Sequence, residues 1–306
     1  MLLTVAGLVI QRGYLEHRSF VTVSGRGVRT QRMQLGPGKW LLLAFCLLVV
    51  FFSAIAPVAV LTAAAFSKSW IEPLLPANFT LAHFRVALFD DQIAVRGIVN
   101  SFKLATGAAL IAVLLGLAIA YIDLRTRMRG RRLLDYLAIL PLGLPGTVMA
   151  VGILLAFIRP PLVLYGTIWI LLVTYVARFV PLAVRSANAT LRQIDPSLEE
   201  AARITGASWS QSIRLVLLPI ARPGLIVAFL LVFIPALSEL SATILLYTGG
   251  TETIAVAIFR LNDLGRLEVV AALAVFMLAV ILAVSLTLNW LASRYGSSVA
   301  TEVPVP

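Results

Sequence analysis

Three observations predict that this chain is an all-α membrane protein, a polytopic helical bundle. Of its 306 residues 60% are hydrophobic and 13% are charged, and the mean hydropathy of +0.97 is too high for a soluble domain. Six apolar runs have the length of membrane-spanning helices. The net charge of +11 comes from lysines and arginines concentrated in short segments between these runs, which is typical of membrane topology and does not indicate nucleic-acid binding.

The apolar runs divide the chain into three parts. Residues 1–39 form a polar, basic N-terminal segment, residues 40–294 a six-helix transmembrane domain, and residues 295–306 a short tail. An apolar stretch at residues 2–10 is too short to span a membrane and lacks the features of a signal peptide. We predict six spans, at residues 40–66, 103–122, 136–158, 162–184, 225–247 and 269–291.

The third predicted span contains a cluster of helix-breaking residues, Pro141, Gly143, Pro145 and Gly146. Proline removes a backbone hydrogen bond, and unpaired backbone at membrane depth is tolerated only against protein or a water-filled cavity. We therefore expect an interrupted helix that faces the interior of the bundle, and we place Pro141 and Pro145 on a candidate permeation path.

The loop charges predict the orientation of the bundle. With six spans both termini lie on one side, and the loops and the N-terminal segment on that side carry 17 lysines and arginines, against six on the other side. Five of the 17 are arginines in the short segment 125–132. Because positive charge is retained on the cytoplasmic side, we expect both termini and the loop after the fourth span to be cytoplasmic.

That loop, residues 195–219, is predicted to form two short helices, and we call it the coupling loop. Asp195 followed by Pro196 suits the start of a helix, although Ser197 with Glu200 is an alternative capping box. Gly206 ends this first helix. Ser208 and Gln211 form a second capping-box pattern, and the second helix is expected to stop before Pro219. On the first helix, spacing places Leu198, Ala201 and Ala202 on one face and Glu199, Glu200 and Arg203 on the other.

The coupling loop resembles the EAA loop of binding-protein-dependent ABC importer permeases. The matching residues are Glu200, Ala201, Ala202, Gly206, Leu218 and Pro219. The resemblance implies a cytoplasmic loop that contacts a separate ATP-hydrolysing subunit. The implied contact residues are Leu198, Glu199, Glu200, Ala201, Ala202, Arg203, Gly206, Leu218 and Pro219. The alternative is an amphipathic interfacial hairpin in which Glu199 pairs with Arg203.

Two further segments resemble ferric-iron-type permeases within that family. Residues 22–27, Thr-Val-Ser-Gly-Arg-Gly, are similar to the linker that joins the two halves of fused permeases, which implies that this chain corresponds to a second half. Residues 238–243 and 251–253 are also similar to ferric-iron importers. Polyamine, thiamine and phosphonate importers share the coupling loop and remain alternatives for the substrate.

Glu239 is the acidic residue that lies deep in a predicted span. A charge at mid-membrane is costly, so its carboxylate is expected to face protein or water. The small neighbours Ala236 and Ala242, at helical spacing, favour close packing of another helix on this face. Two roles stay open, a hydrogen-bonded brace between helices or a polar station on the permeation path together with Ser238 and Ser241.

The resemblance implies several partners and no enzymatic activity in the chain itself. We expect a dimer of ATPase subunits carrying ATP and magnesium, a second permease half, a substrate-binding protein and membrane lipid, in a bacterial inner membrane. The sequence contains no phosphate-binding loop and no metalloprotease or serine-hydrolase motif, and its single cysteine forms no metal-binding cluster. No bound cofactor, metal or nucleic acid is expected, and a secondary transporter or a membrane hydrolase is the less favoured reading.

Overall fold

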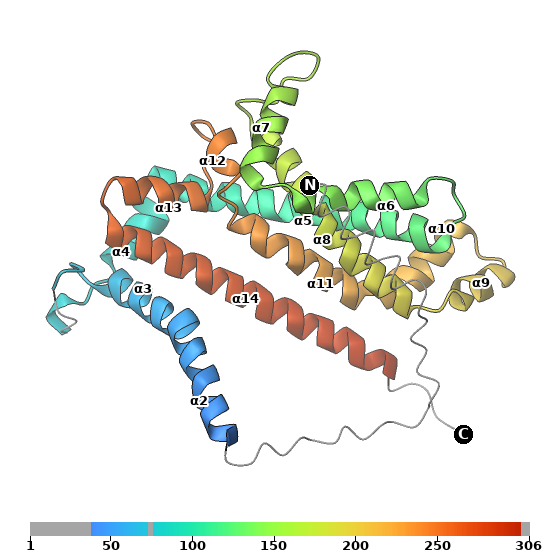
Figure 1. Cartoon of the computed structure of the whole chain (residues 1–306), viewed down its shortest axis with the longest axis horizontal. Helices are drawn as coiled ribbons and strands as arrows, with labels where there is room; N and C mark the ends of the chain where they lie inside the picture. The colour runs from blue at the N-terminus through green and yellow to red at the C-terminus, as the bar shows by residue number, and fades with distance from the viewer. Residues whose placement is uncertain (1–37, 73–75, 301–306) are drawn as a thin grey trace. The chain divides into compact units, whose positions relative to one another are not determined.

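The computed structural model describes residues 38–72 and 76–300, and the regular structure in these residues is helical throughout. An isolated bridge pairs Ser67 with Phe79, and no strand is formed within the described part. The chain divides into two units, residues 1–61 and 62–306. The linker-like segment 22–27 and the last residues of the tail lie outside the described residues. The all-α prediction is confirmed (Figure 1).

The first predicted span is confirmed as a continuous apolar helix, Gly38–Phe66. It consists of α2 (Gly38–Val50), a π-helical turn (Phe51–Ile55) and α3 (Ala56–Phe66). The apolar side chains of α2 are exposed, as expected for a surface that lipid or another protein covers in a membrane. Among the described residues, five helices are long and apolar enough to cross a membrane, or up to six if a bent pair is counted as one span.

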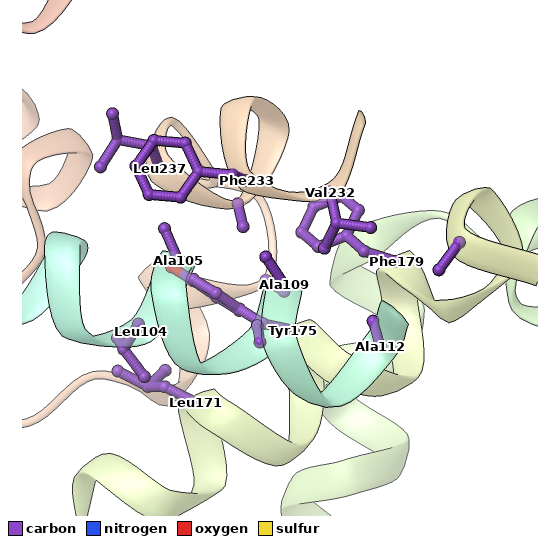
Figure 2. Close-up of a cluster of buried hydrophobic side chains, with 14 of the residues drawn as sticks. Leu104, Ala105, Ala109, Ala112, Leu171, Tyr175, Phe179, Val232, Phe233 and Leu237 are labelled. Carbon is purple, nitrogen blue, oxygen red and sulfur yellow. The ribbon is translucent and has the colours of Figure 1, made fainter. Parts of the chain in front are cut away.

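The centre of the second unit is formed by α5 (Gln92–Arg125), α8 (Ile168–Gln193) and α11 (Leu218–Leu237). Small residues on α5 allow the helices to approach closely, and Gly116 lies against the backbone of Ala183 on α8. Figure 2 shows Tyr175 of α8 beside Ala105 and Ala109 of α5. Because lipid supplies no hydrophobic driving force between helices, close van der Waals packing of this kind stabilises the bundle.

Helix α5 is longer than the predicted second span. It begins at Gln92, because the carboxylate of Asp91 accepts hydrogen bonds from the backbone N–H groups of Ile93 and Ala94, both at 3.0 Å. The prediction of a start at Lys103 was wrong because the first three turns carry polar residues and are not uniformly apolar. The fourth predicted span is likewise shifted, to α8, since residues 162–167 are not helical.

The third predicted span is broken, as its prolines and glycines indicated. Helix α6 (Arg131–Ile139) continues into a 3₁₀ turn (Leu140–Gly143), and α7 (Gly146–Phe157) then leaves at an angle of 114°. The two helices therefore form a bent or re-entrant pair, and not one straight span over residues 136–158. Missing proline N–H groups end the helical hydrogen-bond pattern at this position.

The fifth predicted span has both ends wrong. Helix α9 (Ser197–Ile204) is separate, but α10 (Trp209–Ser212), a π-helical turn (Ile213–Leu217) and α11 form one continuous helix that does not stop before Pro219. The π turn donates its last hydrogen bond from Leu218 to Ile213, so Pro219 follows without interrupting the helix. At the other end α11 stops at Leu237, ten residues before the predicted end.

The last residues of the fifth predicted span form a separate short helix, α12 (Thr243–Leu246), and the segment between the fifth and sixth predicted spans contains α13 (Ile254–Asp263). Helix α13 packs on α5 and α14 (Leu267–Ala300) and buries Ile254, Val256 and Leu261. Near α5 the chain also forms the short α4 (Ala82–Arg85) and a π-helical turn (Val86–Asp90). Helix α14 is the sixth predicted span and extends past it in both directions.

Candidate coupling loop and polar helix junction

The coupling loop begins with a short helix whose ends are fixed by local hydrogen bonds. The carboxylate of Asp195 accepts a hydrogen bond of 2.9 Å from the Ser197 backbone N–H, and this bond holds the pKa of Asp195 below its ordinary value. Of the two predicted starts, this contact favours Asp195 with Pro196, since Ser197 is already the first residue of α9. Asp195 therefore satisfies an amide at the start of α9.

Gly206 ends the first helix, as predicted. Its φ of +95° is a left-handed conformation, and nothing lies within 4 Å of the position that a Cβ atom would occupy. The glycine is therefore required for its backbone conformation and not for close packing. The predicted capping box is also formed, because the Ser208 hydroxyl accepts from the Gln211 backbone N–H and the Gln211 side chain accepts from the Ser208 N–H.

The faces of α9 differ from those that spacing predicted. Glu199 and Ala202 are partly buried, three residues apart, and form the inward face. The other predicted contact residues of α9 are exposed, namely Leu198, Glu200, Ala201 and Arg203, and so is Ile204 at 85%. The prediction grouped Glu199 with the exposed charges because helical spacing alone does not specify which charge has a buried partner. Leu218 and Pro219 lie separately, half-buried at the start of α11.

A second polar region lies where α11 ends and the chain turns towards α12, and we call it the helix junction. Glu239 lies in this break, so the helical face that the sequence suggested around it does not exist. The side chain of Glu239 is 7% exposed and forms an ion pair of 3.1 Å with Arg178 on α8. One of its oxygens also accepts hydrogen bonds from the Ser241 hydroxyl at 2.9 Å and the Ala242 N–H at 2.8 Å.

Arg178 was missed as a functional partner by the sequence reading. It lies in the middle of α8, near Ser241 at 3.5 Å, and a Cβ atom added to Gly146 at the start of α7 would collide with its guanidinium group. The available signal was an arginine inside an apolar run, which required a buried acidic partner. The junction therefore brings together α8, the α11–α12 break and the first residue of α7.

The remaining candidate path residues are placed differently. Pro145 directly precedes Gly146 and so lies at the junction, whereas Pro141 lies in the 3₁₀ turn. Ser238 is exposed and donates a hydrogen bond of 3.3 Å to the Ile234 carbonyl. Only part of the predicted path is thus assembled at Arg178 and Glu239, and a role of these residues in permeation stays a prediction.

The segment 248–253, which includes residues 251–253 that resembled ferric-iron importers, forms a loop packed against α5. Glu252 is 2% exposed, and its carboxylate lies 3.7 Å from Arg96 and 3.9 Å from Arg260. Asn100 donates hydrogen bonds of 3.0 and 2.9 Å to the carbonyls of Gly250 and Glu252. The loop is therefore part of the packed bundle, not a mobile connection.

Among the described residues, no group of three or more histidine, cysteine or acidic side chains is arranged to hold a metal ion. An open groove of about 430 Å³ lies between α8 and α11, and its lining is mostly small or apolar. Gly224 of α11 packs here against Thr190 of α8, where any Cβ atom would collide with the threonine side chain. The two helices are thus in close contact at this position, next to the groove.

Comparison with known proteins identifies similar transport proteins. Residues 112–297 match the family model described as "Binding-protein-dependent transport system inner membrane component". The chain is 30% identical over 285 residues to a ferric transport system permease protein FbpB of Actinobacillus pleuropneumoniae, covering 92% of this chain but 41% of that protein. It is 32% identical over 253 residues to a putative 2-aminoethylphosphonate transport system permease protein PhnV of Salmonella paratyphi A, covering 83% of this chain and 94% of that protein.

Among solved structures, a bacterial ABC transporter involved in the import of the polysaccharide alginate is similar in fold. The match has a TM-score of 0.67 at 22% identity and covers 84% of this chain and 96% of that one. The chain spans only about two fifths of the length of the ferric relatives, 41% and 40% of the two FbpB proteins. The phosphonate relatives, in contrast, are matched over nearly their whole length.

Proposed function

Because this chain belongs to the family of binding-protein-dependent transport system inner membrane components, we propose that it is a permease subunit of an ATP-driven importer. It forms part of the transmembrane pathway, and a separate subunit hydrolyses ATP. The observation that carries the proposal is the coupling loop, in which a short helix with an exposed outer face is ended by Gly206 at φ +95°. Helix α10 then continues without interruption into the membrane helix α11, so a displacement of the loop also displaces this membrane helix.

The exposed face of α9 is the proposed docking surface for the ATPase subunit. It presents Leu198, Ala201 and Ile204 as apolar contacts, with Glu200 and Arg203 as charges beside them. A small apolar area rimmed by charge suits a protein partner better than lipid. The same surface favours a coupling loop over an interfacial hairpin, because Glu199 is paired with Arg125 of α5 and not with Arg203.

Co-purification tests this docking surface. The chain is expressed together with the ATPase subunit of its importer. The amount of ATPase that co-purifies with the chain is measured for Ala201→Trp and for the matched control Ala77→Trp. Both alanines are exposed, but Ala77 lies in the segment between α3 and α4. We expect Ala201→Trp to reduce ATPase recovery at least about tenfold, since a bulky side chain blocks close approach, and the control to retain it. Equal recovery from both variants would remove the docking assignment.

Ferric iron is the proposed substrate, delivered by a periplasmic or extracellular binding protein, and 2-aminoethylphosphonate is the alternative. Relatives named for each substrate are about equally similar to this chain, at 30–32% identity. The resemblance of residues 238–243 and 251–253 to ferric-iron importers favours iron. Uptake of labelled ferric iron and of labelled phosphonate into vesicles containing the whole complex separates them, because each requires its own binding protein.

We further propose that the chain works with a second permease half. A separate first-half polypeptide is the preferred partner, a homodimer is second, and membership of a longer fused chain is third, as the 41% coverage of the ferric relatives also allows. The complex is proposed to lie in a bacterial inner membrane with the coupling loop and both termini on the cytoplasmic side. Native mass spectrometry of the active complex measures the stoichiometry, and one copy of this chain without another half would refute the assembly.

A further inference from the structure

Helix α9 has an unusual attachment to the rest of the bundle. None of its eight residues is fully buried, so no apolar side chain inserts from it into the core. Glu199 and Ala202 are partly buried, and of these Glu199 carries the polar contacts, with a side chain that is only 12% exposed. The side-chain contacts that position α9 against the membrane helices therefore include, as their polar part, those of the Glu199 carboxylate.

These contacts join α9 to the last turns of α5. The Nε atom of Arg125 lies 3.2 Å from one carboxylate oxygen of Glu199, and the arginine side chain is only 10% exposed. The same guanidinium donates hydrogen bonds to the carbonyls of Leu191, at 3.1 Å, and Ile194, at the C-terminal end of α8. One arginine thus connects three helices, and low exposure strengthens its charged contacts relative to a solvated ion pair.

The second oxygen of Glu199 is also held. The hydroxyl of Tyr121, one turn earlier on α5, donates to it at 3.0 Å. Trp209, the first residue of α10, donates from its indole Nε1 to the Tyr121 oxygen at 3.0 Å, and the two rings pack edge to face. The four side chains of Glu199, Arg125, Tyr121 and Trp209, which we call the clamp, therefore connect both helices of the coupling loop to α5.

We propose that the clamp, with Glu199 as its positioning residue, transmits the movement of α9 to α5 and α8 during the transport cycle. This inference rests on the proposed function and assigns Glu199 a role distinct from that of its exposed neighbour Glu200. A loop attached only by flexible chain moves without displacing the bundle. Because both carboxylate oxygens of Glu199 contact side chains of α5, displacement of α9 pulls on α5 and, through Arg125, on α8, two of the three helices at the centre of the bundle.

The first experiment uses the chain alone in lipid nanodiscs and so does not depend on a transport function. Hydrogen exchange of the α9 amides is compared between wild type, Glu199→Gln and Arg125→Gln. We expect exchange to be faster by about tenfold in both variants, because a charged partner of the clamp is lost. The matched control is Arg127→Gln, which removes an exposed arginine two residues from Arg125 and is expected to leave the exchange unchanged.

The second experiment uses the whole complex with its ATPase and binding protein in vesicles. It measures recovery of the ATPase and the number of substrate molecules transported per ATP hydrolysed. Glu199→Gln is expected to retain the ATPase but to lower the transport ratio about tenfold, whereas Glu200→Gln weakens ATPase recovery. Tyr121→Phe, which removes one hydroxyl and keeps the ring, is expected to lower the ratio less than Glu199→Gln.

The outcomes separate the clamp from the proposed function. If hydrogen exchange of the α9 amides is unchanged in Glu199→Gln, the clamp is overturned. It is also overturned if Glu199→Gln loses as much ATPase recovery as Glu200→Gln, since Glu199 is then a docking contact. Normal transport per ATP in Glu199→Gln overturns its role in transmission. If the wild-type complex recruits no ATPase, the proposed importer function fails, while the exchange measurement still decides whether the clamp positions α9.

Discussion

The ion pair between Arg178 and Glu239 makes a quantitative prediction about stability. In Arg178→Met the carboxylate of Glu239, which is 7% exposed, keeps its hydrogen bonds from Ser241 and Ala242 but loses its charged partner. Removing one member of a buried pair costs about 3–5 kcal/mol. Because the Arg178 side chain is 22% exposed and the pair is therefore not fully enclosed, we expect the lower end, about 3 kcal/mol.

The reverse change is expected to be milder. Glu239→Gln keeps the shape and much of the hydrogen bonding, and the charge that remains is on Arg178, the more exposed of the two side chains at 22% against 7%, so we expect a cost of about 1–2 kcal/mol. In the double variant neither charge is left alone, and the combined cost should be smaller than the sum by about 1–2 kcal/mol. This non-additivity is the signature of direct contact between the two side chains.

Thermal unfolding in detergent measures these differences. A change of 1 kcal/mol shifts the melting temperature of a chain of this size by about 2–4 °C, so a cost of about 3 kcal/mol in Arg178→Met should lower it by roughly 6–12 °C. The control is Arg185→Met, the same substitution at an exposed arginine on the same helix, which should shift it by less than about 2 °C. If the free-energy costs of Arg178→Met and Glu239→Gln simply add in the double variant, the two side chains do not form a stabilising ion pair.

Transport by the same variants decides between the two roles that the sequence left open for Glu239. A brace tolerates Glu239→Gln, whereas a charge-dependent path for a cation does not. The ion pair favours the brace, because the positive charge of Arg178 already neutralises the carboxylate. Ferric-iron uptake at the wild-type rate, with normal expression, would exclude the permeation role, and loss of uptake without loss of stability would exclude the brace.

Two predictions concern glycines and compare positions with matched controls. Gly206→Ala should lower the stability by about 1–2 kcal/mol and reduce transport-stimulated ATP hydrolysis, because φ is +95° at this position. The matched control is Gly249→Ala, where a Cβ atom also meets open space but φ is not positive. This control should be close to neutral in the same melting and ATPase assays. Gly116→Ala would place a Cβ atom 2.9 Å from the Cβ atom of Ala183, so α5 and α8 must separate, at a cost of roughly 1–3 kcal/mol. The matched control is Gly152→Ala on α7, where the new Cβ atom meets open space, and it should leave the melting temperature unchanged or raise it. Equal melting temperatures within either pair would contradict the corresponding argument.

The sequence by itself determined the class of the protein and the local signals of its coupling loop. Apolar runs separated by basic segments require membrane helices because backbone polar groups must be satisfied internally in lipid. The glycine at Gly206 and the capping box at Ser208 and Gln211 were equally readable, since each acts through hydrogen bonds or backbone angles within a few residues. The break near Pro141 and Pro145 belongs to the same group, because proline acts on its own helix.

Only the tertiary structure decided where the helices end and which charges meet. Helix α11 stops at Leu237 within an apolar run that predicted ten more residues, because the packing of Glu239 against Arg178 provides an alternative to helical continuation. Spacing likewise placed Glu199 among the exposed charges, whereas Arg125, 74 positions away in the chain, holds it inward. Ion pairs between distant helices leave no periodic trace in either segment, and so they are decided by the packing of α5, α8 and α11 alone.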